Sequence, residues 1–175
     1  LIWQVNVGGN NGIYGLDPAT GAVVTSITSG GAWTSVSQRG LGYDADTDTF
    51  YIGGWNEDII YHIMGPSWST PGAVIAAYSF PVSIAGLEYH PDGVLWVSTN
   101  SAPDMIYGID MESLAVIHQF QHPYHGNYSG AGLALHEDGN LWVASQENNY
   151  VYLVNTEMPI SAGITVDPSS GAVAQ

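Results

Sequence analysis

Short apolar segments alternate with polar turns along the whole chain, and none shows the 3.6-residue period of a helix. Four kinds of segment recur. The first opens on Gly-Leu, the second has an aromatic residue at its second position, the third reads Ile-Tyr or Val-Tyr, and the fourth is a run of small and β-branched residues. Such segments predict β-strands. The predicted strands are 40–43, 86–89 and 132–135 of the first kind, 2–5, 50–53, 95–98 and 141–144 of the second, 13–17, 60–63, 106–110 and 151–154 of the third, and 22–26, 73–77 and 114–118 of the fourth.

The segments recur at a fixed interval. Gly40, Gly86 and Gly132 each open a strand of the first kind and lie 46 residues apart. The Asp-Gly pairs ending at Gly93 and Gly139 predict tight hairpin turns between the first and second strands of their units. Four short antiparallel strands in each repeat of about 46 residues predict an all-β fold, the β-propeller. A β-sandwich is the alternative, but it predicts no fixed period.

The strand count gives just under four blades. The first strand is missing from the unit 1–35, the units 36–82 and 83–129 are complete, and the unit 130–157 lacks a fourth strand. Propellers have roughly 4 to 8 blades. Three arrangements are therefore open: a closed ring of four blades, a ring completed by a second chain, and an open arc whose other blades lie in a further segment.

Two stretches carry a family resemblance. Residues 132–143 and 13–23 resemble repeats of the NHL, YVTN and quinoprotein-like superfamilies of secreted bacterial and archaeal proteins, and the resemblance extends over about residues 1–157. It implies a propeller whose first strands line a central channel. It does not imply one function, because related propellers serve as lyases, lactonases, dehydrogenases and binding platforms. Residues 158–175 are predicted to be a linker followed either by a terminal strand of the last blade or by the start of an Ig-like module, which they resemble.

Composition excludes several functions. The chain has 16 acidic residues and one cation, Arg39, giving a net charge of -15, which excludes nucleic-acid binding. The absence of cysteine excludes a disulfide scaffold, a cysteine nucleophile and a cysteine-based zinc site. No apolar run approaches the ~20 residues of a membrane helix, so membrane insertion is not expected. Because only 10% of the residues are charged and small polar residues take their place, we predict an extracellular or cell-surface location.

Aromatic residues fall into two groups. Trp3, Tyr51, Trp96 and Trp142 occupy the same position in successive repeats, and we expect them to pack in the core. Others lie outside this position and are candidates for a rim that contacts a protein or carbohydrate ligand, because loop aromatics offer large contact areas at small entropic cost. These candidates are Trp33, Trp55, Trp68, Tyr124 and Tyr128.

Two clusters are candidates for metal ligands. Three acids alternate as in the start of a calcium loop, although Thr49 replaces the glycine that such a loop needs. Three histidines form the densest imidazole group of the chain. The candidate ligands are Asp44, Asp46, Asp48, His118, His122 and His125. The alternatives are a solvated turn and an ordinary polar loop, so no cofactor is firmly implied, and calcium or another divalent cation remains open.

Two single residues complete the set of candidates. Glu88 lies on a strand that the propeller resemblance places along the channel, where acids hold the metal in propeller lactonases. One acid does not make a metal site, and its equivalents in the neighbouring repeats are Gly42 and Ala134. Asn127 begins an Asn-Tyr-Ser glycosylation sequon.

The sequence favours a non-catalytic module of a secreted or surface protein, acting as a binding and assembly platform for proteins or glycans. Self-association through open blade edges would be part of that role. The alternative is a metal-dependent propeller enzyme of the lyase or lactonase type with its site at the channel mouth. A group of at least three converging His, Asp or Glu side chains on one propeller face would favour the enzyme.

Overall fold

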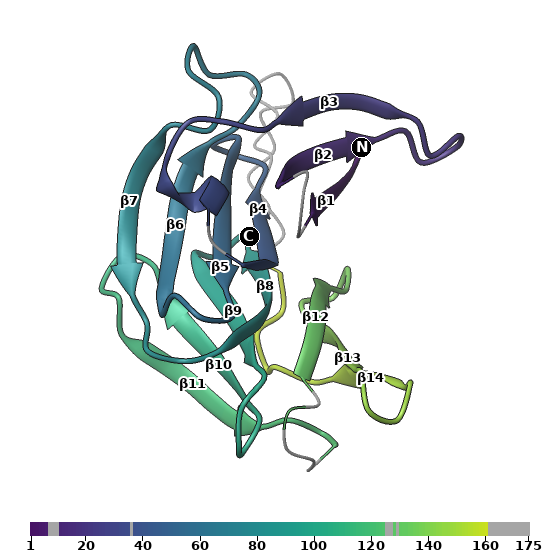
Figure 1. Ribbon diagram of the computed structural model, residues 1–175. Coiled ribbons are helices and arrows are strands. Elements are labelled where there is room, and N and C mark those ends of the chain that lie inside the picture. The colour runs from purple at the N-terminus through teal and green to yellow at the C-terminus, as the bar shows by residue number, and fades with distance from the viewer. Residues whose placement is uncertain (7–10, 36, 125–127, 129, 161–175) are drawn as a thin grey trace, which may run out of the picture.

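The computed structural model describes residues 1–6, 11–35, 37–124, 128 and 130–160 (Figure 1). These residues form four antiparallel sheets, each with its strands in chain order, which we number as blades 1 to 4. Blade 1 consists of β1 (Ile2–Asn6), β2 (Gly12–Leu16) and β3 (Val23–Ile27). Blade 2 consists of β4 (Gln38–Asp44), β5 (Thr49–Gly54), β6 (Ile59–Met64) and β7 (Val74–Ser79). Blade 3 consists of β8 (Ile84–His90), β9 (Val94–Thr99), β10 (Met105–Asp110) and β11 (Val116–Gln121), and blade 4 of β12 (Gly130–Leu135), β13 (Leu141–Ser145) and β14 (Val151–Val154).

This architecture confirms the predicted all-β fold with just under four blades. All fourteen predicted strands are present, and among the described residues blade 1 has no first strand and blade 4 no fourth strand, as the repeat predicted. The described residues contain one 3-10 turn, η1 (Ala32–Ser35), and no α-helix. No helix in this part of the chain is long and apolar enough to cross a membrane. Strand β11 begins at Val116, two residues later than the predicted strand 114–118. Leu114 has a positive φ of 59° and belongs to the turn before β11.

The four blades follow one another around an arc that does not close (Figure 1). Strands β4, β8 and β12 open their blades and lie side by side on the inner side of this arc. The chain enters blades 2, 3 and 4 at their inner strands and runs outward by hairpins. Gly93 and Gly139 have φ values of 87° and 86°, so the two Asp-Gly turns that follow inner strands use the positive φ that glycine tolerates.

Apolar side chains fill the spaces between blades. Each space is filled by residues from the facing strands of two neighbouring blades, and the space between blades 1 and 2 also takes Trp33 of η1. The buried apolar residues are Ile13, Ile27, Trp33, Phe50, Ile52 and Ile63 between blades 1 and 2, Tyr51, Ile60, Ile84, Leu87, Leu95, Val97 and Ile109 between blades 2 and 3, and Val94, Trp96, Ile106, Leu141 and Val143 between blades 3 and 4. The hydrophobic core is therefore divided into three layers, one for each pair of neighbouring blades.

Candidate binding site at the start of the inner strands

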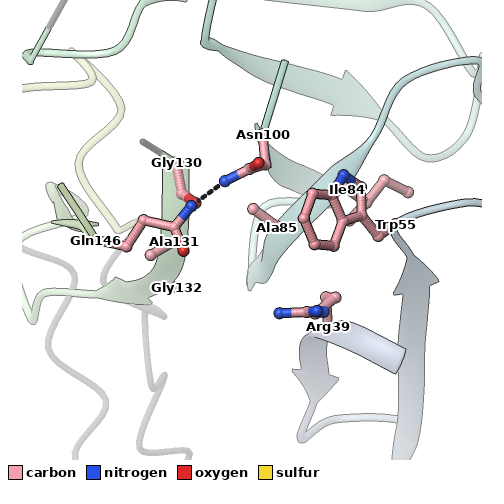
Figure 2. Close-up of a pocket in the computed structure, with 9 residues that line it drawn as sticks. All are labelled: Arg39, Trp55, Ile84, Ala85, Asn100, Gly130, Ala131, Gly132 and Gln146. Atoms are coloured by element: carbon pink, nitrogen blue, oxygen red, sulfur yellow. Dashed lines mark hydrogen bonds between the residues drawn. The ribbon is translucent and has the colours of Figure 1, made fainter. Parts of the chain in front are cut away.

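A pocket with a cavity volume of about 190 Å³ lies where the inner strands of blades 2, 3 and 4 begin (Figure 2). Two sets of equivalent residues from the three repeats contribute to it. Arg39, Ala85 and Ala131 lie near the start of β4, β8 and β12, whereas Trp55, Asn100 and Gln146 each directly follow the second strand of a blade. Ile84, Gly130 and Gly132 complete the lining. Equivalent backbone positions therefore build one site, and the side chains at them decide its chemistry.

Arg39 is the one cation of the chain, and it lies in this pocket. Its guanidinium carbon lies 4.7 Å from the centre of the Trp55 ring, a cation–π contact. No carboxylate among the described residues pairs with it. The nearby carboxylate of Glu57 instead accepts backbone hydrogen bonds from Ser37 (3.0 Å) and Asn56 (3.1 Å). The exposed guanidinium therefore keeps its hydrogen-bond donors available to a ligand.

The opposite wall of the pocket is built by amide side chains. The Asn100 Nδ2 group donates to the carbonyl oxygens of Tyr128 (3.1 Å) and Gly130 (2.8 Å), the second of which is drawn in Figure 2. The Gln146 Nε2 group also donates to the Tyr128 carbonyl. Asn100 is only 5% exposed, and its Oδ1 atom is buried with no hydrogen-bond partner in the protein. The pocket thus has a cationic donor on one side and a wall of hydrogen-bonded amide side chains on the other (Figure 2).

The predicted rim aromatics lie in different places. Trp55 lines the pocket, and Tyr128 contributes its carbonyl oxygen while its side chain is exposed. Tyr124 is half-buried, and its backbone N–H donates to His122 Nδ1 (3.2 Å). Trp33 is fully buried between blades 1 and 2, so it presents no surface to a ligand. Trp68 lies in the loop after β6, where its indole N–H donates to the Thr47 and Asp48 carbonyls. A common rim of the three tryptophans is therefore not formed.

The predicted acidic ligands take part in turn hydrogen bonds. Asp44 accepts the backbone N–H groups of Asp46 (3.0 Å) and Thr47 (3.4 Å) and the Thr47 hydroxyl (2.7 Å). Asp48 accepts the Tyr43 hydroxyl (2.9 Å) and the Ser67 N–H (2.6 Å). Burial opposes ionisation of Asp48, but these hydrogen bonds outweigh it and hold its pKa below the ordinary value.

The predicted histidine ligands are held by different neighbours. His118 stacks on Trp96 with ring centres 5.4 Å apart. His122 is buried, with Nε2 3.2 Å from the Ala144 carbonyl oxygen. His125 and Asn127 lie outside the described residues. Within the described ranges, no three His, Asp or Glu side chains are grouped so that they could hold a metal ion.

A second pocket, of about 240 Å³, lies at the other end of the inner strands, beside the turns that follow them. Tyr43, Asp44, Asp46, Glu88 and Tyr89 line it, together with smaller residues. Burial raises the pKa of Glu88 to about 8, although a hydrogen bond from the Tyr89 N–H opposes this shift. A carboxyl group in this environment stays protonated at neutral pH.

Replacing Glu88 by glutamine tests this protonation. The unfolded chain ionises Glu88 near its model-peptide value of 4.5, whereas the folded chain holds the proton to about pH 8. The folded state therefore binds more protons in this window, and wild-type stability falls as pH rises from about 4.5 to 8. We expect Glu88→Gln to match wild type in urea denaturation at pH 4 and to be more stable at pH 9. A stability difference that does not change with pH would contradict the assignment.

Sequence reasoning missed Arg39 and Asn100 as site residues. The position of Arg39 could have been found from the repeat, because Arg39 precedes Gly40 just as Ala85 and Ala131 precede Gly86 and Gly132. The other two repeats have alanine at this position, so packing does not require an arginine there. Because the chain has no other Lys or Arg, this departure from the repeat marks Arg39 as a candidate site residue. Asn100 carried no such signal, because its burial depends on the loop before β12.

Successive antiparallel sheets of three or four strands, arranged in an arc with β4, β8 and β12 along its inner side (Figure 1), define a β-propeller fold. Solved structures support this class. The chain matches glutaminyl cyclase of Myxococcus xanthus (TM-score 0.66, 15% identity, 90% of this chain and 63% of that one). It also matches virginiamycin B lyase of Staphylococcus aureus (TM-score 0.56, 18% identity, 87% and 48%) and a WD40 β-propeller domain (TM-score 0.57, 15% identity, 83% and 44%).

These similarities concern the fold alone, because every identity is below 20%. The chain spans about half the length of the solved chains it matches. No protein-family model matches the sequence, and no curated protein matches it significantly. The propeller class is therefore established, whereas the function has to be argued from the site.

Proposed function

We propose that these blades form a non-catalytic binding module of a secreted or cell-surface protein, and that the Arg39 pocket binds a carboxylate group of a protein or glycan ligand. One observation supports this most. The one cation in a chain of net charge -15 lies exposed over the Trp55 ring in a pocket, with no carboxylate paired to it among the described residues. In so acidic a protein, a free arginine is the group able to attract an anion.

The contacts in the pocket support a carboxylate in particular. A guanidinium presents parallel N–H donors that fit the two oxygens of a carboxylate. The Trp55 ring orients this guanidinium and gives an apolar surface on which a sugar ring or peptide side chain can pack.

A pair of probes that differ only in charge tests the proposal. We expect glucuronate, in the millimolar range, to shift the NMR signals of the Arg39 side chain and the Trp55 indole, and glucose to shift them far less. Arg39→Gln should weaken glucuronate binding about 10- to 150-fold, because a charge-assisted hydrogen bond contributes roughly 1.5–3 kcal/mol. Arg39→Lys, which keeps the charge but loses the planar group, should weaken it less.

Rising salt gives an independent measurement. The affinity for glucuronate should fall on the order of several-fold when the salt concentration rises from 20 to 500 mM, because salt screens an exposed ion pair. Equal affinity for glucose and glucuronate, or an unchanged affinity of Arg39→Gln, would contradict a carboxylate site.

The metal-dependent enzyme needs at least three converging His, Asp or Glu side chains. The described part of the chain contains no such group, so no observation made on it favours a metal-dependent lyase or lactonase. Glu88 is half-buried, and the titratable residues that line the pocket with it are tyrosines and the turn residues Asp44 and Asp46, with no histidine among them. The binding module is therefore the function that we carry forward.

A further inference from the structure

A third pocket, with a cavity volume of about 240 Å³, lies between blades 2 and 3, the two four-stranded sheets of Figure 1. Its walls come from the outer part of blade 2 and from the end of β10 and the turn after it in blade 3. None of the described residues that line it is acidic or basic. The apolar lining consists of Ile60, Tyr78, Phe80, Ile109, Met111 and Leu114.

The equivalent position between blades 1 and 2 is filled by the indole ring of Trp33. This ring is fully buried and packs in one layer with Ile13, Ile27 and Ile63. Its N–H donates to the carbonyl oxygen of Gly72, which lies in the turn before β7, at 2.8 Å. The chain therefore supplies its own aromatic ring at this position in one of its blade interfaces.

Strand register shows that the two positions are equivalent. The first two residues of each set form a cross-strand pair between the third and fourth strands of a blade. The third residue of each set lies opposite the first residue of the outer strand in the following blade. The equivalent residues are Ile60 for Ile13, Tyr78 for Ile27 and Ile109 for Ile63. The residues that surround the indole in one layer thus line an open pocket in the next.

The linkers between the blades explain the difference. Residues 28–37 join β3 to β4, and η1 within this linker carries Trp33 into the layer. Only residues 80–83 join β7 to β8. Phe80 of this shorter linker packs edge-to-face on Tyr107, with ring centres 5.5 Å apart, and forms a wall of the pocket. The short linker therefore leaves open the position that an indole fills in the neighbouring layer.

The turn before the outer strand differs from the repeat at the pocket. Gly21, Gly72 and Leu114 occupy the same position of this turn in blades 1, 2 and 3, with φ values of 70°, 83° and 59°. A leucine in the left-handed region costs conformational energy that glycine avoids. The Leu114 side chain is 50% exposed, so core packing does not offset this cost, and it lines the pocket. Strain of this kind is typical of ligand sites.

We propose that this pocket binds a small planar aromatic molecule of the indole type, in the position that Trp33 holds between blades 1 and 2. The pocket is larger than the ~150 Å³ of a cavity that binds benzene and smaller than the ~300–1,000 Å³ of pockets for drug-sized ligands, so a two-ring molecule fits. The Leu114 carbonyl, equivalent to that of Gly72, accepts the ring N–H. The site shares no residue with the Arg39 pocket and does not rest on the function proposed for that pocket.

The ligand is a free molecule rather than a tryptophan side chain of a partner protein. Between blades 1 and 2 the linker backbone runs so close to the turn that a Cβ atom on Gly72 would lie 2.2 Å from the Ser29 carbonyl oxygen. Leu114 has this Cβ atom, so a chain segment cannot follow the same path over the pocket between blades 2 and 3. A ring without a peptide backbone avoids the contact.

An NMR titration of the whole chain with indole tests the proposal. We expect a dissociation constant of roughly 0.1–1 mM, because so small a ligand buries little area, and intermolecular NOEs from the indole protons to the methyl groups of Ile60 and Ile109. Benzofuran has the same shape without the N–H and should bind about 2- to 12-fold more weakly, the net effect of one hydrogen bond. N-acetyltryptophanamide carries the same ring on a peptide backbone and should bind more weakly than indole.

Two alanine variants in blade 3 locate the site. Leu114→Ala should weaken indole binding about 3- to 10-fold, because part of the apolar wall is lost. Ile117→Ala is the matched control, since Ile117 is 49% exposed, almost as much as Leu114, and is not among the residues that line the pocket. It should leave the affinity unchanged, as should Arg39→Gln. Circular dichroism checks that the variants keep the fold.

Several results would overturn the proposal. They are the absence of indole binding up to about 10 mM, the absence of NOEs to Ile60 and Ile109, and equal affinities for indole and benzofuran. Equal losses in Leu114→Ala and Ile117→Ala would place the ligand elsewhere. Tighter binding of N-acetyltryptophanamide than of indole would instead assign the pocket to a tryptophan of a partner chain.

Discussion

Replacing Trp33 with alanine is expected to lower the free energy of unfolding by about 3–5 kcal/mol, as for other buried tryptophans. The Trp33 indole is fully buried between blades 1 and 2, in the same apolar layer as Ile27 and Phe50. Its N–H donates to the Gly72 carbonyl oxygen at 2.8 Å. Truncation would therefore leave a cavity, and the carbonyl oxygen of the buried residue Gly72 would lose its hydrogen-bond donor. Urea denaturation followed by circular dichroism measures the change.

Trp68→Ala is the matched control, because Trp68 also lies in a loop and also donates its indole N–H to backbone carbonyls, those of Thr47 and Asp48. Its side chain is 40% exposed, so less apolar area returns to water on truncation. We expect a loss of roughly 1 kcal/mol. If the two substitutions destabilised the chain equally, the assignment of Trp33 to the core between blades would be wrong.

The repeat made most of the fold predictable. Alternation within four-residue segments is a local property, and a 46-residue period shows that each segment has the same role in every unit. The predicted strand 50–53 therefore lies within β5, and 151–154 coincides with β14. The structure differs from the prediction mainly at the ends of strands. The turn at Leu114 has a positive φ, so β11 begins after it.

The candidate site could be predicted only in part, because burial of a loop side chain depends on what lies opposite it. Trp33 and Trp55 both fall outside the repeated aromatic position, yet a neighbouring blade covers the first and the second lines a pocket. Trp142 follows the repeat and is nevertheless exposed, since its cover would be another blade. The repeat in the sequence therefore predicts where a residue lies within its blade. Whether its side chain is exposed depends on whether a neighbouring blade covers it.

Gly86→Ala is expected to destabilise the chain by about 2–3 kcal/mol, at the upper end of ordinary overpacking. A Cβ atom at residue 86 would lie 2.6 Å from the Ala131 carbonyl oxygen and 2.9 Å from the Leu133 nitrogen. Both are backbone atoms of β12, so no rotamer change relieves the contact, and β8 and β12 must move apart. The hydrogen bond from the Ser98 hydroxyl to the Ala131 carbonyl, 2.6 Å long, would be strained as well.

Gly132→Ala provides a control at the equivalent position of the next repeat. A Cβ atom there meets nothing within 4 Å, because no further inner strand lies beside β12 among the residues that the structure describes. The substitution should be neutral or should stabilise by up to about 1 kcal/mol through the reduced entropy of the unfolded chain. Equal losses in urea denaturation for both glycines would contradict the close approach of β8 and β12.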